Sequence, residues 1–195
     1  MENTTTVIDS DVPKRNIVID VDGIILDFSK SFTRYHNSIS STVIAENPQS
    51  WNYDTDKKYK NTLHKHITNF INAGPTLELF DDHWPELTGK LQNKYNVNIV
   101  TAYRHQQSRI DNLRKYNIKY DNIHFTVNTN KVETICKLNP VYIFEDCPIH
   151  VQNLSKKLDD TIIYTPNHWN YVKNIPDAHN IVKYEYLKND TVNII

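Results

Sequence analysis

The chain has 195 residues, which suffices for one domain with an insertion but hardly for two full domains. Hydrophobic residues make up 38% and charged residues 23%, and the formal net charge is −1. This balance is typical of a soluble globular protein and excludes a generally basic nucleic-acid coat, so no nucleic-acid polymer is expected as a partner. No apolar run approaches the roughly 20 residues that span a bilayer, so no membrane association is predicted.

The N-terminal residues 1–13 are polar and rich in threonine, without the apolar core of a signal peptide. We therefore expect a flexible tail and a cytoplasmic protein. The two cysteines, Cys136 and Cys147, form no Cys-x-x-Cys pair, which favours a reducing compartment. The nine histidines include no His-Glu-x-x-His pattern, so they are interpreted as packed or solvated side chains rather than zinc ligands.

Five short, β-branched runs predict buried strands, and segments with helical spacing separate the later ones. The predicted strands cover 16–20, 97–101, 123–127, 141–144 and 161–164. Three predicted helix faces consist of Ile110, Leu113 and Tyr116, then Val132, Ile135 and Leu138, then Val151, Leu154 and Leu158. This alternation predicts an α/β fold, a Rossmann-like parallel sheet with helices on both faces. The segment after Tyr164 could add an edge element, which its sequence does not place.

The interval between the first two predicted strands, residues 21–96, is far longer than the dozen or so residues that a crossover needs. Part of it has helical patterning of its own, and Ala73-Gly74-Pro75 is typical of an exit turn. We predict a helical insertion over 29–74 and a core over 14–28 and 75–195. In open α/β sheets ligands bind at the carboxyl ends of the strands, so the insertion would cover the site.

The first predicted strand ends in two carboxylates, Asp20 and Asp22, followed by Gly23. Burying carboxylates there is costly unless something binds them. A hard cation with oxygen ligands is the natural partner, and magnesium suits a site with few carboxylates plus a phosphate. Gly23 allows a sharp turn past the site. An ordinary turn is the alternative, because Asp and Gly commonly end strands.

Polar residues mark three further predicted strand ends. Thr101 ends the second strand, Lys131 follows the third at the start of a helix, and Glu145 and Asp146 follow the fourth. The carboxyl ends of parallel strands lie on one side of a sheet, so these side chains should converge on the two aspartates of the first strand end. Each has a structural alternative, as a strand residue, a solvated helix residue or a helix cap. Coincidence at every strand end in this order is not expected.

Together these residues resemble the four motifs of the haloacid dehalogenase (HAD) superfamily, in the same order and spacing. Within it, the chain resembles the 5′(3′)-deoxyribonucleotidase group, whose Asp-x-Asp-Gly-x-x-x-Asp-Phe pattern is seen from Asp20 to Phe28. That group also carries a small helical cap after the first motif. The resemblance implies a magnesium-dependent hydrolase of phosphomonoesters, with a nucleoside monophosphate as substrate and an aspartyl-phosphate as intermediate.

The resemblance also implies a role for each matching residue. Asp20 would be the nucleophile and a metal ligand, and Asp22 the general acid/base with its backbone carbonyl on Mg²⁺. Thr101 and Lys131 would hold the phosphoryl oxygens, with Gly23 beside them in the phosphate-binding loop.

Asp146 would complete the metal shell, with Glu145 beside it. Two departures put efficiency and substrate choice in question. Glu145 stands where the family usually has Asp, and Ala102 follows Thr101 where the nucleotidases often have Ser.

The candidate substrate contacts are Phe28, Trp51 and Arg104. Phe28 matches a family position that contacts the base, and Trp51 lies in the predicted insertion, where an aromatic face could stack on a nucleobase. Both rings could equally pack the insertion onto the core. Arg104 and His105 follow Thr101 and could contact substrate or simply begin a helix.

Three other functions are alternatives. A response-regulator receiver is rejected, because the third predicted strand ends in Thr126-Val127-Asn128 without an Asp, and because a receiver has no such insertion. A non-catalytic binding protein on the same fold is disfavoured by the presence of Asp20. A phosphatase for a sugar phosphate, a protein or a nucleic-acid end stays open, as does a homodimer.

Overall fold

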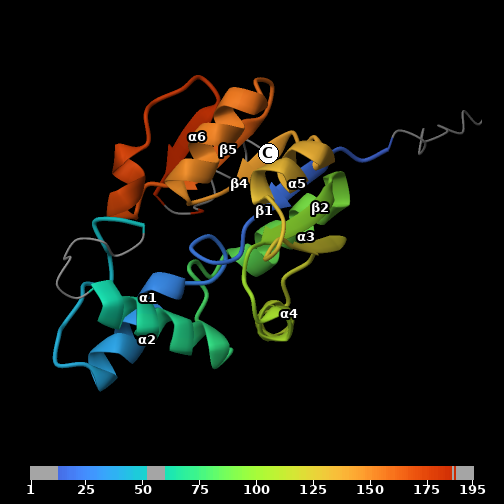
Figure 1. Ribbon diagram of the computed structural model, residues 1–195. Coiled ribbons are helices and arrows are strands. Elements are labelled where there is room, and N and C mark those ends of the chain that lie inside the picture. Colours follow the sequence, from blue (N-terminus) through green and yellow to red (C-terminus); the bar gives the residue numbers. More distant parts are fainter. Residues whose placement is uncertain (1–12, 52–59, 186, 188–195) are drawn as a thin grey trace, which may run out of the picture.

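The computed structural model describes residues 13–51, 60–185 and 187, so nearly all of the predicted N-terminal tail lies outside the described residues. Strands of one parallel sheet follow the order β3-β2-β1-β4-β5-β6 (Figure 1). They are β1 Asn16–Ile19, β2 Asn96–Thr101, β3 Asn122–Phe125, β4 Tyr142–Phe144, β5 Ile162–Pro166 and β6 Ile181–Tyr184. The predicted α/β, Rossmann-like sheet is confirmed, with strand ends within two residues of those expected.

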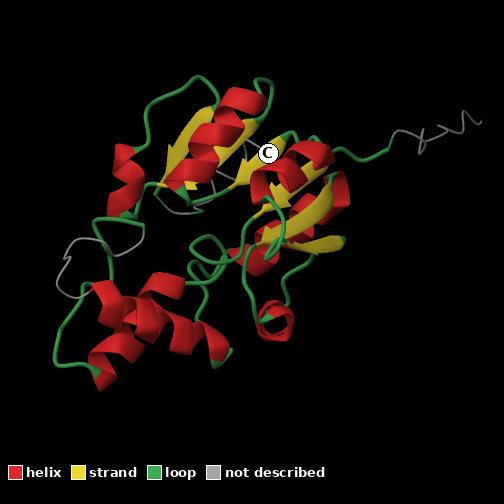
Figure 2. Ribbon diagram, viewed as in Figure 1, coloured by secondary structure: helices red, strands yellow, loops and turns green. Residues whose placement is uncertain are grey.

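Helices cover both faces of this sheet (Figure 2). They are α3 Trp84–Lys94, α4 Gln106–Lys115, α5 Lys131–Leu138 and α6 Pro148–Lys157. Because successive strand residues point to opposite faces, Ile17 and Ile19 of β1 pack with α3 and α4, whereas Val18 packs with α5 and α6. Burial on both faces explains why the strands are apolar throughout rather than alternating.

The predicted apolar faces of α5 and α6 are largely buried, but the face of α4 differs from the prediction. Leu113 is fully buried as expected, whereas Ile110 is only half-buried. The remaining buried side chains of α4 are polar: Ser108, Arg109 and Asn112. This polar stripe faces backbone groups and a carboxylate, so its burial is compensated by hydrogen bonds and does not follow apolar periodicity.

The C-terminal segment supplies the edge of the sheet. β6 pairs in parallel with β5, so Ile181 and Val182 do form the edge strand that the sequence could not place. A 3₁₀ helix, η1 Asn170–Asn174, precedes it, and the buried rings of Trp169 and Tyr171 pack with the α5–α6 face.

A second group of helices lies beyond the carboxyl ends of the strands (Figure 1, lower left). It consists of α1 Phe28–Ile39 and α2 Lys60–Asn72, which pack through aromatic side chains. The ring of Phe32 lies 5.7 Å from that of Phe70. The imidazole of His36 is buried between the helices, in agreement with its interpretation as a packed side chain.

The chain leaves and re-enters the sheet layer through two adjacent crossings. The N–H of Asp27 donates to the carbonyl of Glu78 at 3.0 Å, and the N–H of Phe80 donates to the carbonyl of Ile25 at 2.8 Å. Asp27 also caps α1 by accepting a hydrogen bond from the Lys30 N–H. These crossings lie close to the predicted limits of the insertion, whose standing as a separate unit stays a prediction. Within the described ranges, every helix is too short or too polar to traverse a lipid bilayer.

Candidate functional site

The loop after β1 places Asp20 and Gly23 against the loop after β4. The backbone N–H of Asp20 continues the sheet by donating to the Phe144 carbonyl at 2.9 Å. Gly23 has a φ of +88°, which L side chains rarely adopt. A Cβ at Gly23 would overlap the carboxylate of Asp146. Glycine is therefore required on two grounds, the backbone conformation and the close approach of a carboxylate.

Lys131 lies between two buried carboxylates. It is the first residue of α5, which begins at the Asn130 cap, and its side chain is 5% exposed. Its Nζ lies 2.6 Å from Asp20 Oδ2 and 2.8 Å from Glu145 Oε2. The lysine thus links the ends of β1 and β4 from the start of the helix that follows β3, as the strand-end argument predicts.

Burial and mutual repulsion shift the ionisation of this cluster. Burial raises the pKa of Asp20 to about 7, against the opposing charge of Lys131. Burial also raises the pKa of Asp146 well above its usual range, with further repulsion from Asp20 and Glu145. At Glu145 burial acts in the same direction, but the charges of Lys131 and His150 outweigh it and lower the pKa to about 2. Lys131 and His150 supply two positive charges for three acids, so the site favours a further cation.

Asp146 carries an unpaired oxygen. Its Oδ2 accepts a hydrogen bond from the hydroxyl of Tyr171 at 2.8 Å. Its Oδ1 is buried and has no hydrogen-bond partner among the described residues. Oxygen atoms of Asp20, Glu145 and Asp146 all lie within 4.8 Å of one another. An all-oxygen, carboxylate-rich set with an unpaired buried oxygen fits a hard divalent cation such as Mg²⁺.

Glu145 also belongs to a second group of side chains. It accepts hydrogen bonds from the Cys147 N–H at 3.1 Å and from the ring of His150 at 3.3 Å. Burial lowers the pKa of His150, but hydrogen bonds with Cys147 and Glu145 outweigh it and raise that pKa to about 10. No motif in the sequence indicates that His150 lies here. It lies in the first turn of α6, and its ring contacts Glu145.

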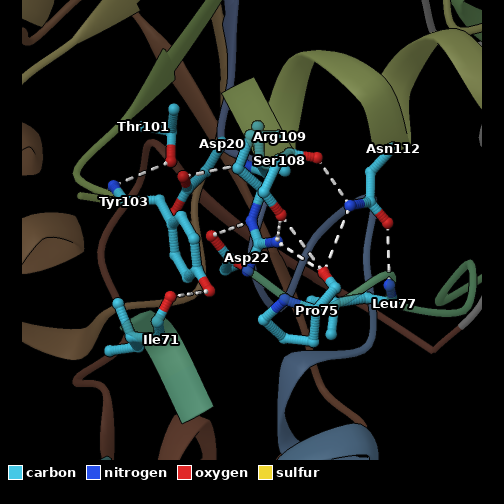
Figure 3. A network of polar contacts seen from close by, with 11 residues as sticks. Asp20, Asp22, Ile71, Pro75, Leu77, Thr101, Tyr103, Ser108, Arg109 and Asn112 are labelled. Carbon is cyan, nitrogen blue, oxygen red and sulfur yellow. Dashed lines mark hydrogen bonds and ion pairs between the residues drawn. The ribbon is translucent and has the colours of Figure 1, made fainter. Parts of the chain in front are cut away.

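The second aspartate of the loop, Asp22, is held by a residue that the sequence analysis missed. Its two carboxylate oxygens face the guanidinium of Arg109, with Nη2–Oδ1 at 2.7 Å and Nε–Oδ2 at 3.1 Å (Figure 3). Arg109 comes from α4, the helix after β2, and is fully buried. Helical periodicity gave no sign of it, because Arg is normally assigned to a solvated face.

All ten residues predicted for the site line one cavity of 650 Å³ between the strand ends and the α1–α2 pair. They are Asp20, Asp22, Gly23, Phe28, Trp51, Thr101, Arg104, Lys131, Glu145 and Asp146. Thr101 is buried at the end of β2, and its Oγ1 accepts a hydrogen bond from the Tyr103 N–H at 3.2 Å. The structure therefore brings the predicted residues together, while their individual roles stay predictions.

The aromatic candidates line the cavity and also pack. The ring of Phe28 meets that of Phe70 edge-on at 5.6 Å, and Trp51 meets Tyr171 edge-on at 5.3 Å. Both rings therefore pack against neighbouring side chains, and their contact with a substrate base stays a prediction. Arg104 is exposed at the cavity wall, and His105 stands at the N-cap position of α4 without a capping hydrogen bond from its side chain.

Comparison with known proteins yields matches only at the level of structure. No family model matches the chain, and no curated protein does. A HAD-superfamily hydrolase of subfamily IA from Geobacter sulfurreducens has a TM-score of 0.54 at 11% identity, over 93% of this chain and 100% of that chain. A Clostridium difficile chain described as a phosphatase has a TM-score of 0.60 at 13% identity, over 94% of this chain and 100% of that chain.

A third similar structure, a Bacillus subtilis chain described as a HAD-hydrolase, is bound to magnesium. Its TM-score is 0.55 at 12% identity, over 94% of this chain and 99% of that chain. At these identities the likeness establishes the fold alone. The chain therefore has the fold of HAD-superfamily hydrolases, and its activity has to be argued from its own residues.

Proposed function

We propose that this protein is a magnesium-dependent phosphomonoesterase that acts through an aspartyl-phosphate on Asp20. The observation that carries the proposal is the convergence of three buried carboxylates and one buried lysine at the carboxyl edge of the sheet, beside a cavity. Such a cluster is costly for folding alone, because two cations, Lys131 and His150, face three acids. The cluster is explained if it binds a divalent cation and a phosphate.

Hydrolysis then proceeds in two balanced steps. In the first, a carboxylate oxygen of Asp20 forms a bond to phosphorus and the ester P–O bond breaks, while Asp22 gives its proton to the leaving oxygen. In the second, Asp22 takes a proton from a water molecule. The water oxygen bonds to phosphorus, and the bond between phosphorus and Asp20 breaks, which releases phosphate and restores the carboxylate.

The residues around Asp20 stabilise the transferring phosphoryl group. Lys131, 2.6 Å from Asp20, places a positive charge where negative charge develops, and the Thr101 hydroxyl donates from the neighbouring strand end. Gly23 would lie beside the phosphate, in the loop after β1. Asp20, Glu145 and Asp146 would hold Mg²⁺, together with the backbone carbonyl of Asp22. Bound Mg²⁺ would supply Lewis-acid stabilisation of the phosphoryl oxygens.

The finer proposal is that the substrate is a nucleoside monophosphate and that α1 and α2 form a cap over it. The α1–α2 pair supplies apolar lining to the cavity, including Phe28 and Ile67, and Trp51 adds an aromatic edge. Aromatic faces suit a nucleobase, and Arg104 at the wall suits a phosphate or sugar hydroxyl. We place this reaction in the cytoplasm, where cysteines stay reduced, in line with the free Cys136 and Cys147. A homodimer is the alternative to a monomer.

One alternative follows from the same site. A cavity of 650 Å³ also admits a sugar phosphate, and nothing in the catalytic cluster itself selects a base. A binding protein without turnover is disfavoured, because Asp20, Lys131 and the metal ligands are all in place.

Phosphate release from a panel of nucleoside 5′- and 3′-monophosphates, with Mg²⁺ and with chelator, tests the proposal. Mg²⁺-dependent release that Asp20→Asn abolishes is the expected result. Release from sugar phosphates or an aryl phosphate, but not from nucleotides, would keep the phosphatase and discard the nucleotidase. Full activity of a folded Asp20→Asn protein would overturn the mechanism.

A further inference from the structure

Arg109 is a fully buried cation whose guanidinium contacts three parts of the molecule (Figure 3). One edge of the guanidinium faces the carboxylate of Asp22. Its face stacks on the ring of Tyr103, with 3.4 Å between the guanidinium carbon and the ring centroid. Its Nη1 donates to the carbonyl of Pro75 at 3.4 Å. Among the residues that the structure describes, Asp22 is the one carboxylate that pairs with this buried charge.

The contact with Asp22 is a two-point contact. Nε donates a hydrogen bond to Oδ2, and Nη2 forms an ion pair with Oδ1 without making a hydrogen bond to it, so both oxygens face the guanidinium and the rotation of the carboxylate is restricted. A lysine ammonium at this place would be a point charge without that directional hold. The side chain of Asp22 is 20% exposed on the cavity side, whereas Arg109 is not exposed and does not line the cavity. Arg109 therefore reaches the cavity only through Asp22.

The other side of the network holds the segment by which the chain returns from α2. The carbonyl of Pro75 accepts hydrogen bonds from Arg109, from the Ser108 hydroxyl at 3.3 Å and from the Asn112 amide at 3.3 Å. The Leu77 N–H donates to the Asn112 Oδ1 at 2.7 Å.

The hydroxyl of Tyr103, the residue on which Arg109 stacks, donates to the Ile71 carbonyl at 3.2 Å. The polar stripe of α4 thus joins the end of the α1–α2 pair to the carboxylate beside the nucleophile. These links explain why the buried face of α4 carries polar side chains.

We propose that Arg109 is the positioning residue for Asp22. It fixes the carboxylate of Asp22 relative to residues 71–77. This inference rests on the proposed function, in which Asp22 delivers a proton to the leaving oxygen and then takes one from water. Both transfers require one carboxylate oxygen at a defined place, and a side chain that rotates freely loses much of the rate gained by orientation. Arg109 removes that freedom without touching the substrate.

The test compares variants at both positions with two leaving groups. Arg109→Gln removes the charge and the fork, Arg109→Lys keeps the charge alone, and Arg114→Gln makes the matched charge change at an exposed position of the same helix. The substrates are a deoxynucleoside monophosphate, whose alkoxide needs a proton, and 2,4-dinitrophenyl phosphate, whose phenolate does not. Rapid quench separates formation of the phosphoenzyme from its hydrolysis.

Arg109→Gln should slow the first turnover of the nucleotide by about 10- to 100-fold, since a positioned acid contributes at least that much. The first turnover of the dinitrophenyl ester should change little, and the phosphoenzyme should accumulate as a burst because its hydrolysis still needs Asp22. Arg109→Lys should fold and show the same pattern in milder form. Arg114→Gln should match the wild type.

A double-mutant cycle gives the decisive readout. If Arg109 acts through Asp22, the double variant Asp22→Asn/Arg109→Gln should be about as slow as Asp22→Asn alone. Losses that multiply, or equal slowing of both esters, would assign Arg109 to general stability and overturn its positioning role. Should the Gln variant not fold, the cycle with Arg109→Lys decides in the same way. A wild type that turns over neither ester would overturn the proposed function and this role with it. If the wild type is active and Asp20→Asn abolishes that activity, the proposed function stands. Losses that multiply in the double variant then contradict only the role of Arg109.

Discussion

The indole N–H of Trp169 donates a hydrogen bond to the backbone carbonyl of Gly23, at 3.0 Å, and the bond is buried. The same indole stacks on the ring of Tyr171, with 5.8 Å between ring centroids and 8° between planes. The Tyr171 hydroxyl in turn donates to Asp146. The segment between β5 and β6 therefore braces both loops that carry the carboxylates of the site.

Trp169→Phe should lower both stability and turnover. Phenylalanine keeps an aromatic ring for Tyr171 but leaves the buried carbonyl of Gly23 without its donor, which costs about 1–3 kcal/mol. The free energy of unfolding, measured by urea titration, should fall by roughly that amount. Because the loop then loses a fixed point beside Asp20, kcat should fall several-fold as well.

Trp84→Phe is the matched control. Trp84 is also fully buried, but its indole nitrogen has no hydrogen-bond partner among the described residues. The same change of ring there should alter stability through packing and leave kcat near the wild-type value. A kcat loss of the same size in both variants would show that the Trp169 hydrogen bond has no specific part in the site.

Much of the fold and of the cluster could be predicted because both depend on local patterns. Short apolar runs identify strands, and a parallel sheet gathers their carboxyl ends on one side. That rule alone brings Asp20, Lys131 and Asp146 together, as the ion pairs and the metal-type cluster now show. A β-branched run as short as Ile17–Ile19 is enough to predict a strand.

The site residues that the sequence did not predict depend on long-range contacts, which no local pattern encodes. Trp169 meets Gly23 from 146 positions away, and Arg109 meets Asp22 from 87. Arg109 also departs from the rule that the buried face of a helix is apolar, because hydrogen bonds stabilise the polar side chains on the buried face of α4. Side chains of this kind are recognised only when their partners are known.

Gly23→Ala should weaken Mg²⁺ binding more than it weakens folding. The φ of +88° strains any L side chain, and a Cβ would push against the carboxylate of Asp146, a proposed metal ligand. Mg²⁺ should raise the melting temperature of the wild type, because a ligand of the native state stabilises it. That increase should be reduced or lost in the variant, as differential scanning fluorimetry with Mg²⁺ and with chelator would show.

Gly89→Ala provides the comparison, because Gly89 lies inside α3 and a Cβ there meets nothing within 4 Å. It should stabilise the protein by up to about 1 kcal/mol and leave the Mg²⁺ response unchanged. An undiminished Mg²⁺ response in Gly23→Ala would argue against a metal site at Asp146.

Lys131→Met should abolish most turnover and make stability depend on Mg²⁺. The variant keeps the length of the side chain but leaves Asp20 without a paired cation and Glu145 with His150 alone, which costs about 3–5 kcal/mol. Loss of the charge at the phosphoryl group should lower kcat by at least about 100-fold. Urea midpoints should recover in part with Mg²⁺, because the metal ion neutralises the same carboxylates.

Lys137→Met changes an exposed lysine of the same helix and should shift neither property. Equal urea midpoints for the wild type and Lys131→Met in chelator would contradict the argument that this lysine compensates buried charge.

The stabilising contribution of Asp81 should disappear in acid. Burial raises the pKa of its carboxyl, but hydrogen bonds from the N–H and ring of His83 and from the Leu187 N–H outweigh burial and hold the pKa below the ordinary value of 3.8. A carboxyl whose folded pKa is depressed stabilises the native state above its unfolded pKa. That contribution is lost as the pH falls through the folded pKa.

Asp81→Asn should therefore lower the free energy of unfolding by about 1–2 kcal/mol at pH 7, where the wild type has a charged acceptor for three donors. The difference between the two proteins should shrink once the pH falls below 3.8, because the wild-type carboxyl then takes up a proton and becomes as neutral as the amide. Asp82→Asn, at the exposed neighbouring position, separates this effect from a general change in net charge and should show no such pH dependence. Urea titrations of the three proteins between pH 2.5 and pH 7, in the range set by that carboxyl pKa, make the measurement. A difference that stays constant across this range would mean that the hydrogen bonds to Asp81 do not distinguish its charged form from its neutral form.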